Sequence, residues 1–422
     1  MVKDSTLTPE VLQQIEETKE ADVLIGIPSF NNSRTIGHVI RSVRAGLTKY
    51  FGNQRTLIVT SDGGSQDQTA HEIRNAFLED PGLIMLTHSP HAVHKMITPY
   101  DGLPDKAGVF HTLFEIAENL GVRACALVDA NLKSITPEWV ELLIKPVMQE
   151  GFDYVSPSYF RHKYDGTITT SILCPLTRAL YGQRISQPIG SDFGFSTTLI
   201  SHYLSKEVWH TEVARYGIDL WMTITAITDG FKICQSFVGP KVQEPRSPAA
   251  DLSAMLSQVV GASFTLMERY EPFWLTVKGS QPTPIYGRRF EVGIEPVNVK
   301  LDRMINAYRQ GITDLFGVWG HFLPEETLAG LKRLAGLSSL NFHFPDALWA
   351  RTVYDFSVAH FRNKMDRDHL IKSMIPLYLG RTASFVLETQ DSSAADVENK
   401  MELICLEYEN LKPYLIDRWK SS

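Results

Sequence analysis

The sequence predicts an α/β protein with a mostly parallel, twisted sheet flanked by helices and a helical C-terminal region. Two observations support this fold class. In the first part of the chain, short apolar runs alternate with segments of helical periodicity, which is typical of parallel strands joined by helices. After residue 250, helical periodicity dominates. For a chain of 422 residues we therefore expect two domains, over residues 1–250 and 251–422.

The first part of the chain should consist of a polar helix followed by strands and helices in alternation. The expected elements are a helix over 8–19, a strand over 23–28, a helix through Ile36, Val39, Ile40 and Val43, strands over 56–60 and 83–86, a helix over 107–119 and a strand over 124–128. A further helix is expected to start at Thr136-Pro137-Glu138, where a threonine cap precedes a proline in the first turn.

The middle of the chain has a more mixed pattern, and its end is helical. We expect a strand over 152–155, a glycine-rich turn over 186–195 and an apolar helix that follows Asp219. The stretch 279–286 is rich in glycine and proline, which predicts a loop and an internal boundary. The remaining helices are expected over 251–269, 297–315, 324–335, 345–361, 367–380 and 391–412.

Three polar loops should meet at one edge of the predicted sheet. They follow strands, at 29–33, 61–69 and 129–131. Right-handed crossovers place the ends of parallel strands along the same edge, where open α/β sheets bind ligands. Asp62 at such an end can accept hydrogen bonds from a base or a ribose, so the pattern fits a nucleoside-diphosphate site. The Asp62-Gly63-Gly64 stretch is also compatible with a plain tight turn.

Asp129 and Asn131 are candidates for a metal site at the same edge. Side chains alternate along a strand, so oxygen-bearing residues two positions apart leave it on the same side. A carboxylate and an amide oxygen suit a divalent cation that carries phosphate, such as Mg²⁺ or Mn²⁺. The alternative is a strand-end turn, which aspartate and asparagine also favour.

Composition and charge argue against several other classes of protein. The formal net charge of -7 provides no basic field for nucleic acid or for an anionic membrane. The four cysteines form no CxxC pair, which argues against a zinc site and a disulfide scaffold. The N-terminal stretch has no apolar core, and no window approaches 18 uncharged apolar residues. We therefore expect a cytoplasmic protein without a membrane span.

With its loops assembled, the sequence resembles the nucleotide-sugar glycosyltransferases of the GT-A fold. VLIGIPSFNN at 23–32 looks like the start of their first nucleotide-binding strand. SDGGSQDQT at 61–69 is similar to their Asp-Gly-Ser-x-Asp-x-Thr stretch. DAN at 129–131 lies where these enzymes carry a metal-binding Asp-x-Asp.

Within this family the closest resemblance is to the group of mannosylglycerate synthase and glucosyl-3-phosphoglycerate synthase. It rests on DANLKSITPEW at 129–139, QPIG at 187–190, YGID at 216–219 and the helical stretch at 342–361. The resemblance covers most of the chain. It implies a GT-A catalytic domain over 1–250 and a helical domain over 251–422 that completes the acceptor side and makes oligomer contacts.

The resemblance also implies roles for individual residues. The residues implied to bind the nucleotide sugar are Pro28, Phe30, Asn32, Asp62, Gly63, Lys106, Asp129, Ala130 and Gly190. Those implied for the acceptor are Arg161, Gly190, Ser191 and Asp219. Those implied for catalysis are Lys106, Asp192 and Asp219. Those implied for a divalent Mg²⁺ or Mn²⁺ ion are Asp129, Asn131 and Glu244.

The chain departs from the family pattern at the metal motif and at the lysine loop. Asn131 replaces the second acid of the metal motif, which removes one charge. The family's histidine ligand is absent, and Gln243 or Glu244 falls at about its position. Asp105 and Ala107 replace the glycines that flank the lysine in the family. Metal identity and metal dependence are therefore open at this point.

The expected activity is retaining transfer of glucose or mannose from a nucleoside diphosphate to a small hydroxylated acceptor such as D-glycerate or 3-phosphoglycerate. The products would be compatible solutes of the glucosylglycerate or mannosylglycerate kind. Arg161, Arg288 and Arg289 are candidate contacts for an anionic acceptor. One alternative is an inverting, family-2-like transferase that acts on a glycan or lipid-linked acceptor, and another is a non-catalytic nucleotide-sugar-binding protein. Broad apolar stripes on the C-terminal helices predict a homodimer or a larger homo-oligomer.

Overall fold

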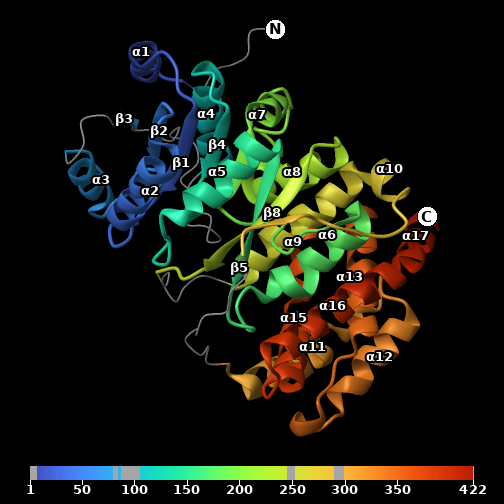
Figure 1. Ribbon diagram of the computed structural model, residues 1–422. Coiled ribbons are helices and arrows are strands. Elements are labelled where there is room, and N and C mark those ends of the chain that lie inside the picture. The colour runs from blue at the N-terminus through green and yellow to red at the C-terminus, as the bar shows by residue number, and fades with distance from the viewer. Residues whose placement is uncertain (1–6, 79–83, 87–104, 245–251, 289–298, 422) are drawn as a thin grey trace. The chain divides into compact units, whose positions relative to one another are not determined.

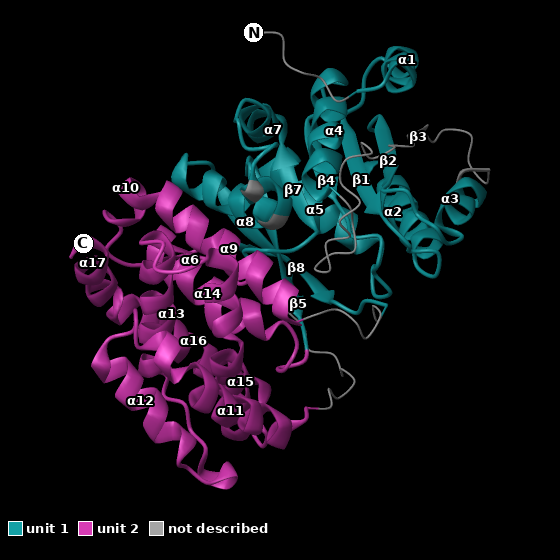
Figure 2. Cartoon of the chain, turned by 180° about the vertical axis from the view of Figure 1, so that it is seen from behind, with its two compact units in different colours: residues 1–161, 187–250, 283–293 teal, residues 162–186, 251–282, 294–422 magenta. Residues whose placement is uncertain are grey.

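The computed structural model describes residues 7–78, 84–86, 105–244, 252–288 and 299–421. The chain forms two compact units (Figure 2). Unit 1 contains residues 1–161, 187–250 and 283–293, and unit 2 contains residues 162–186, 251–282 and 294–422. The chain leaves unit 1 at residue 250, where the sequence predicts a boundary, but it also passes between the units elsewhere. A single boundary therefore does not describe the division.

Unit 1 is built on an eight-stranded sheet with the order β10-β8-β5-β7-β4-β1-β2-β3 (Figure 1). The strands are β1 (Val23–Ser29), β2 (Thr56–Asp62), β3 (Ile84–Leu86), β4 (Ala124–Leu127), β5 (Tyr154–Phe160), β7 (Phe193–Ser196), β8 (Ile233–Pro240) and β10 (Ile285–Tyr286). Neighbouring strands are parallel except where β7 pairs with β4 and β5. The predicted mostly parallel sheet is confirmed.

Helices cover both faces of this sheet. Those of unit 1 are α1 (Pro9–Thr18), α2 (Ile36–Phe51), α3 (Thr69–Leu78), α4 (Lys106–Asn119), α5 (Glu138–Glu150), α7 (Thr197–Leu204) and α8 (Glu212–Thr228). Ile25 and Ile27 of β1 belong to the core cluster that includes the apolar sides of α2 and α5. Gly26 faces the other way, where a β-carbon would lie 2.9 Å from Leu113 of α4. Glycine thus lets α4 approach the sheet closely.

In its described residues, unit 2 is helical apart from a two-stranded pair. Its helices are α6 (Cys174–Tyr181), α9 (Leu252–Arg269), α10 (Glu271–Trp274), α11 (Leu301–Trp319), α12 (Glu325–Ala335), α13 (Asp346–Phe361), α14 (Arg367–Ser373), α15 (Ile375–Thr389), α16 (Ala394–Asn410) and α17 (Lys412–Lys420). A one-turn π-helix (Thr169–Leu173) precedes α6, and a short 3₁₀ turn (Ser339–Asn341) precedes α13. The strands β6 (Gln183–Arg184) and β9 (Gln281–Pro282) pair in parallel. The helical C-terminal region is confirmed.

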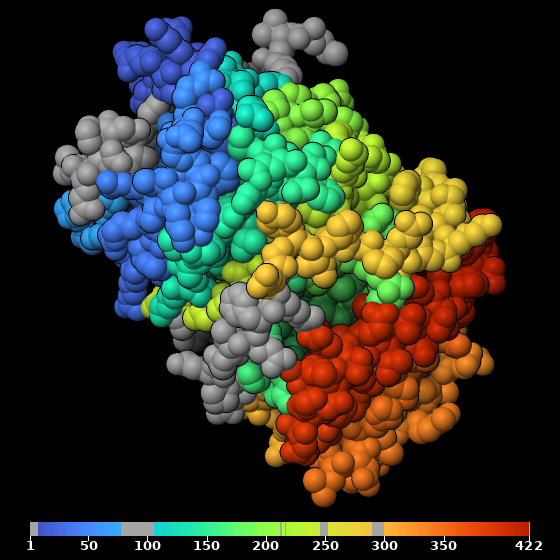
Figure 3. Space-filling model, viewed as in Figure 1, coloured from blue at the N-terminus to red at the C-terminus, as the bar shows by residue number. Residues whose placement is uncertain are grey.

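The apolar stripes of unit 2 are mostly turned inward. Trp319 and Trp349 are completely buried, whereas Leu340 and Leu403 are the large apolar side chains that stay exposed among its described residues. In the space-filling view, the last helices of the chain, in red, form a continuous part of the surface of this unit (Figure 3). The predicted homo-oligomer therefore stays a prediction, because most of the stripes that motivated it pack within the unit.

Several predicted elements differ in detail. The expected helix over 367–380 is two helices, because Pro376 lacks the N–H that would continue α14 and instead lies in the first turn of α15. The expected turn over 186–195 ends in strand β7, and the expected loop over 279–286 contains β9 and β10. Helix α5 begins at Glu138 with Pro137 at its cap position and no side-chain cap from Thr136. None of the helices in the described ranges is both long enough and apolar enough to cross a membrane.

A small residue at position 194 is required by the contact between β7 and α5. A β-carbon at Gly194 would lie 2.2 Å from the carbonyl oxygen of Leu143 and 3.1 Å from Cβ of Val155. Gly194→Ala should therefore lower the free energy of unfolding by about 1–3 kcal/mol through overpacking. Gly317→Ala in α11 is the control, because a β-carbon there meets no atom within 4 Å. Urea unfolding of the two variants measures the difference, and equal stabilities would contradict the packing argument.

Candidate active site

The carboxyl ends of β1, β2 and β4 lie side by side at one edge of the sheet. Strand β1 is central, with Ser29 opposite Asp62 of β2 and Gly26 opposite Leu127 of β4. The three predicted polar loops therefore leave the sheet at neighbouring positions. This is the edge at which open α/β sheets bind ligands.

The loops that follow β1 and β2 are joined through backbone-to-side-chain hydrogen bonds. The backbone N–H of Asn32 donates to Oγ1 of Thr69 at 2.7 Å, and the N–H of Ser33 donates to Oδ2 of Asp67 at 3.1 Å. Burial raises the pKa of Asp67, but hydrogen bonds from Thr69 and Ser33 outweigh it and leave this pKa below its ordinary value. Asn31 has a positive φ of 54° and accepts at Oδ1 from the N–H of Gln66. The loop after β1 is therefore held in one conformation by the loop after β2.

Asp62 organises the turn in which it lies. Its Oδ1 accepts from Oγ of Ser29 at 3.2 Å and from Oγ of Ser65 at 2.5 Å, and its Oδ2 accepts from the N–H of Ser65 at 3.0 Å. The N–H of Gly63 donates to the carbonyl of Ser29 at 2.8 Å. Asp62 therefore closes a tight turn, as the alternative interpretation of this stretch predicts. A contact of Asp62 with a nucleoside stays a prediction.

Both carboxylate oxygens of Asp129 are hydrogen-bonded within the protein. Oδ1 accepts from the N–H of Asn131 at 2.9 Å, and Oδ2 accepts from Nε2 of Gln243 at 2.5 Å. A short antiparallel bridge between Leu132 and Gln243 brings the two segments together. Asn131 donates from Nδ2 to the carbonyl of Glu244 at 3.0 Å, which strengthens the same link. The turn-forming alternative therefore accounts for the contact between Asp129 and Asn131, and the contacts with Gln243 and Glu244 join this turn to the segment that follows β8.

The side chain of Glu244 is turned toward two cations. Its carboxylate forms ion pairs with Arg34, at 2.8 Å, and with Lys133. Hydrogen bonds from Lys133 and Arg34 lower the pKa of this carboxyl. A charge that is already neutralised in this way does not replace the missing acid of the motif.

These contacts decide how well the predicted residues fit a metal ion. Divalent cations with oxygen ligands prefer several carboxylate or carbonyl oxygens directed at one point. No group of three His, Cys, Asp or Glu side chains with that arrangement is found in the parts of the chain that the structure describes. As arranged, Asp129, Asn131 and Glu244 do not fit a divalent ion.

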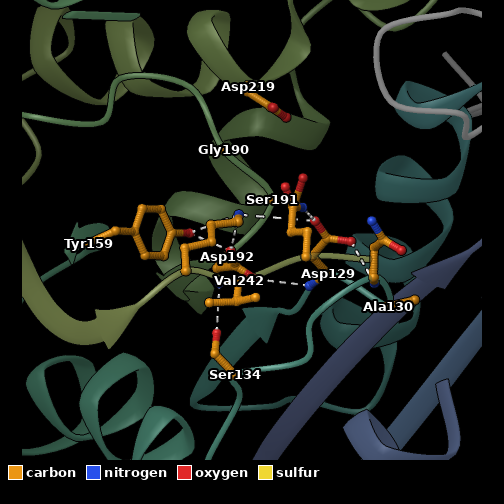
Figure 4. A network of polar contacts seen from close by, with 12 residues as sticks. Asp129, Ala130, Ser134, Tyr159, Gly190, Ser191, Asp192, Asp219 and Val242 are labelled. Atoms are coloured by element: carbon orange, nitrogen blue, oxygen red, sulfur yellow. Dashed lines mark hydrogen bonds and ion pairs between the residues drawn. The ribbon is translucent and has the colours of Figure 1, made fainter. Parts of the chain in front are cut away.

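A buried ion pair lies directly beside Asp129 (Figure 4). Asp192 accepts at Oδ1 from the N–H of Asp129, at 2.9 Å, and at Oδ2 from Nζ of Lys241, at 2.7 Å. The hydroxyl of Tyr159 also donates to Oδ2 of Asp192. Nζ of Lys241 lies 4.0 Å from Oδ2 of Asp129. The side chain of Asp192 is 0% exposed and that of Lys241 is 4% exposed, so this group is withdrawn from solvent.

Lys241 and Tyr159 were not among the residues predicted from the sequence, whereas Gln243 was placed at about the position of the family's histidine ligand. Lys241 directly follows strand β8, just as Asp129 follows β4 closely. A charged residue at the end of an apolar stretch was the signal that could have found it. Burial and the negative charge of Asp192 raise the pKa of Tyr159 well above its ordinary value, so this hydroxyl remains a hydrogen-bond donor.

Lys106 and Asp219 form a second buried ion pair. Nζ of Lys106 donates to Oδ2 of Asp219 at 2.7 Å and approaches the carbonyl of Gly190 at 3.3 Å and Oγ of Ser191 at 3.5 Å. Lys106 is the first residue of α4, and Asp219 lies just after the non-helical Gly217 in α8. The structure thus brings together four residues that the sequence assigns to catalysis and acceptor binding.

The remaining predicted residues are placed as follows. Pro28 lies in β1 opposite Ser61, Phe30 and Asn32 lie in the loop after it, and the carbonyl of Ala130 accepts from Oγ1 of Thr35 at 2.7 Å. The guanidinium of Arg161 lies 4.9 Å from the centre of the Tyr159 ring. Arg288 is exposed, and Arg289 lies outside the described residues. The roles of all these side chains stay predictions.

No protein-family model and no curated protein sequence matches the chain. Among solved structures, the chain is similar to glucosyl-3-phosphoglycerate synthase from Mycobacterium tuberculosis. A complex of that enzyme with Mn²⁺, UDP-glucose and phosphoglyceric acid is 20% identical, with a TM-score of 0.44, over 63% of this chain and 86% of that chain. A complex of the same enzyme with Mg²⁺ and UDP is 20% identical, with a TM-score of 0.43, over 61% of this chain and 83% of that chain. The sequence motifs indicate the same group of enzymes.

The buried ion pair of Lys241 with Asp192 should contribute more to stability than the partly exposed ion pair of Arg34 with Glu244. Asp192→Asn leaves the buried ammonium of Lys241 without its closest carboxylate and should lower the free energy of unfolding by about 3–5 kcal/mol. Glu244→Gln disrupts a partly exposed pair and should leave stability almost unchanged. Guanidinium chloride unfolding at neutral pH measures both. Equal effects would show that the Lys241–Asp192 pair is not the buried support described here.

Proposed function

We propose that the chain is a retaining glycosyltransferase of the GT-A type. It would move glucose or mannose from a nucleoside diphosphate to a small hydroxylated acceptor such as D-glycerate or 3-phosphoglycerate. The observation that carries the proposal is the arrangement at the sheet edge. Hydrogen-bonded loops after β1 and β2 lie next to the turn after β4, and a buried lysine contacts the glycine-containing turn at Gly190.

The loops after β1 and β2 would form the nucleoside side of the site. The backbone of residues 29–33 is held by Ser65, Asp67 and Thr69. Ligand binding therefore does not have to offset the entropy cost of ordering this loop. Pro28, Phe30 and Gly63 would contribute surface to the base and ribose. Asp62 would accept from a ribose or base while it keeps its own turn closed.

Lys106 would stabilise the departing diphosphate. Its ammonium lies next to the carbonyl of Gly190 and the hydroxyl of Ser191, in the turn implied for the sugar and the acceptor. Asp219 holds this ammonium at 2.7 Å and so sets its position. A fixed positive charge at the point where negative charge develops lowers the barrier, because no reorganisation is needed during the reaction.

The contacts of the two nearby acids support front-face attack over a covalent glycosyl-enzyme intermediate. Retaining glycosidases use two carboxylates, one of which is the nucleophile. Here both oxygens of Asp192 are occupied by Asp129, Lys241 and Tyr159, and Asp219 is held by Lys106. In the proposed reaction, the acceptor hydroxyl attacks the anomeric carbon while the departing diphosphate oxygen takes its proton.

A non-catalytic nucleotide-sugar-binding protein is the second candidate. It is favoured by the extent to which Asp62 and Asp129 already satisfy their hydrogen bonds within the protein. Transfer of radiolabelled hexose from UDP- or GDP-sugars to glycerate or 3-phosphoglycerate separates the candidates. Product formation supports the transferase, and binding without product supports the binding protein. Cytoplasmic location and homo-oligomerisation are retained as proposals.

Asp62→Ala should weaken nucleotide binding by at least tenfold while the protein remains folded. The reason is the position of this carboxylate at the end of β2, beside the loop of β1. A thermal-shift panel of UDP- and GDP-sugars identifies the base, since a ligand at 100 times its Kd stabilises the native state by about 2.7 kcal/mol. Calorimetry then compares wild type, Asp62→Ala and the control Asp229→Ala, whose carboxylate pairs with Lys206 away from the edge. An unchanged Kd for Asp62→Ala would remove this residue from the site.

Lys106→Gln should lower kcat by about 10²–10³-fold, the loss typical of removing one donor that stabilises transition-state charge. The Kd for the nucleotide sugar should change much less, because the charge on the departing oxygen develops mainly in the transition state. Circular dichroism establishes that the variant is folded, and Lys206→Gln serves as the matched control. A variant that retains more than half of the wild-type kcat would contradict the role of Lys106.

A further inference from the structure

The ammonium of Lys241 occupies the surroundings of the carboxylate that the sequence predicts to bind a metal ion. It donates to Oδ2 of Asp192 at 2.7 Å and to the hydroxyl of Tyr159 at 3.3 Å, and it lies 4.0 Å from Oδ2 of Asp129. The ammonium also lies 4.6 Å from the centre of the Tyr159 ring, whose face attracts cations. Lys241 is thus held by Asp192 and Tyr159 at a position from which its charge reaches both Asp129 and Asp192.

Four of the acids at this edge face a lysine or an arginine side chain. Asp129 and Asp192 face Lys241, Asp219 faces Lys106, and Glu244 faces Arg34 and Lys133. Asn131 adds an amide where a second acid would add a charge. A dication bound at Oδ2 of Asp129 would face the ammonium of Lys241 in surroundings with little solvent, where like charges repel strongly.

We propose that Lys241 is the built-in cation of this site, so that the chain binds its nucleoside diphosphate without a divalent metal ion. The proposal rests on the proposed function for the identity of the ligand. Lys241 acts through Asp129 as a positioning residue: its charge compensates the Asp129 carboxylate, which would otherwise repel the diphosphate. Lys106 then supplies the positive charge that faces the departing group.

Removal of Lys241 should convert the site into one that binds a metal. In Lys241→Met, the backbone N–H of Asp129 still holds Asp192 at 2.9 Å, and the two carboxylates that Nζ of Lys241 approaches, at 4.0 Å and 2.7 Å, stay beside the vacated volume. Two carboxylates that no ammonium faces, together with a vacated volume that water can enter, favour a divalent cation whose other ligands are water molecules. Lys241→Arg keeps the charge and should, like wild type, bind no divalent cation. A purely structural lysine would not produce this pattern, because its loss would change stability without creating a metal site.

The first test is a titration of nucleotide-free protein with Mn²⁺, followed by electron paramagnetic resonance. Wild type, Lys241→Arg and the control Lys206→Met should show no saturable Mn²⁺ site, and Lys241→Met should show one. Asp129→Asn added to Lys241→Met should abolish that site. A stoichiometric Mn²⁺ site in wild type that is lost in Asp129→Asn would overturn the proposal.

The second test needs only the wild-type protein, so it holds even if Lys241→Met fails to fold. Calorimetry measures the Kd of UDP and GDP in EDTA and in Mg²⁺. Values that agree within twofold support the built-in cation, and a tenfold or greater loss of affinity in EDTA overturns it. Absence of binding by either nucleotide under both conditions would instead refute the proposed function, and the Mn²⁺ titration would still decide the role of Lys241.

Discussion

The parallel pairing of β1 with β2 and β4 is the constraint on which the site of unit 1 depends. Because Ser29 lies opposite Asp62 and Gly26 opposite Leu127, three strand ends fall at one edge of the sheet. The loops that follow are then close enough for the N–H groups of 31–33 to bond to Ser65, Asp67 and Thr69. A shift of one residue would turn the apolar side chains of β1 to the opposite face, so the core and the loops depend on the same register.

Buried charge is the second organising feature of this edge. Two lysines, Lys106 and Lys241, are each held by an aspartate at 2.7 Å with little exposure to solvent. Each buried charge would be costly by itself, and each pair is supported by additional donors or acceptors, such as Tyr159 and the carbonyl of Gly190. Both ammonium groups are therefore fixed in position by the fold, which is the condition for preorganised electrostatic stabilisation.

Sequence patterns located most elements but not their exact pairing or their interruptions. The apolar run before Asp129 and the spacing of Ile36, Val39, Ile40 and Val43 are local signals, so strand β4 and helix α2 were expected where they occur. Strand β7 was missed because Phe193–Ser196 is short and contains a glycine that the contact with α5 requires. Pro376 indicates a helix break in the sequence, but the helical periodicity on both sides of it led to the prediction of one continuous helix.

The sequence by itself determined the order of strands and helices, the polar strand ends and the presence of Lys106, Asp129 and Asp219, because periodicity and turn chemistry are local properties of the chain. Only the tertiary structure decided which charges face one another. Lys241 lies 112 residues after Asp129 and 49 residues after Asp192 in the chain, and Glu244 turns to Arg34 and Lys133 instead of to Asp129. Such pairings depend on how the ends of β4, β7 and β8 meet, which no local pattern records. Asp129 and Glu244 could therefore be predicted as metal ligands from the sequence, although in the fold Asp129 faces the ammonium of Lys241 and Glu244 pairs with Arg34 and Lys133.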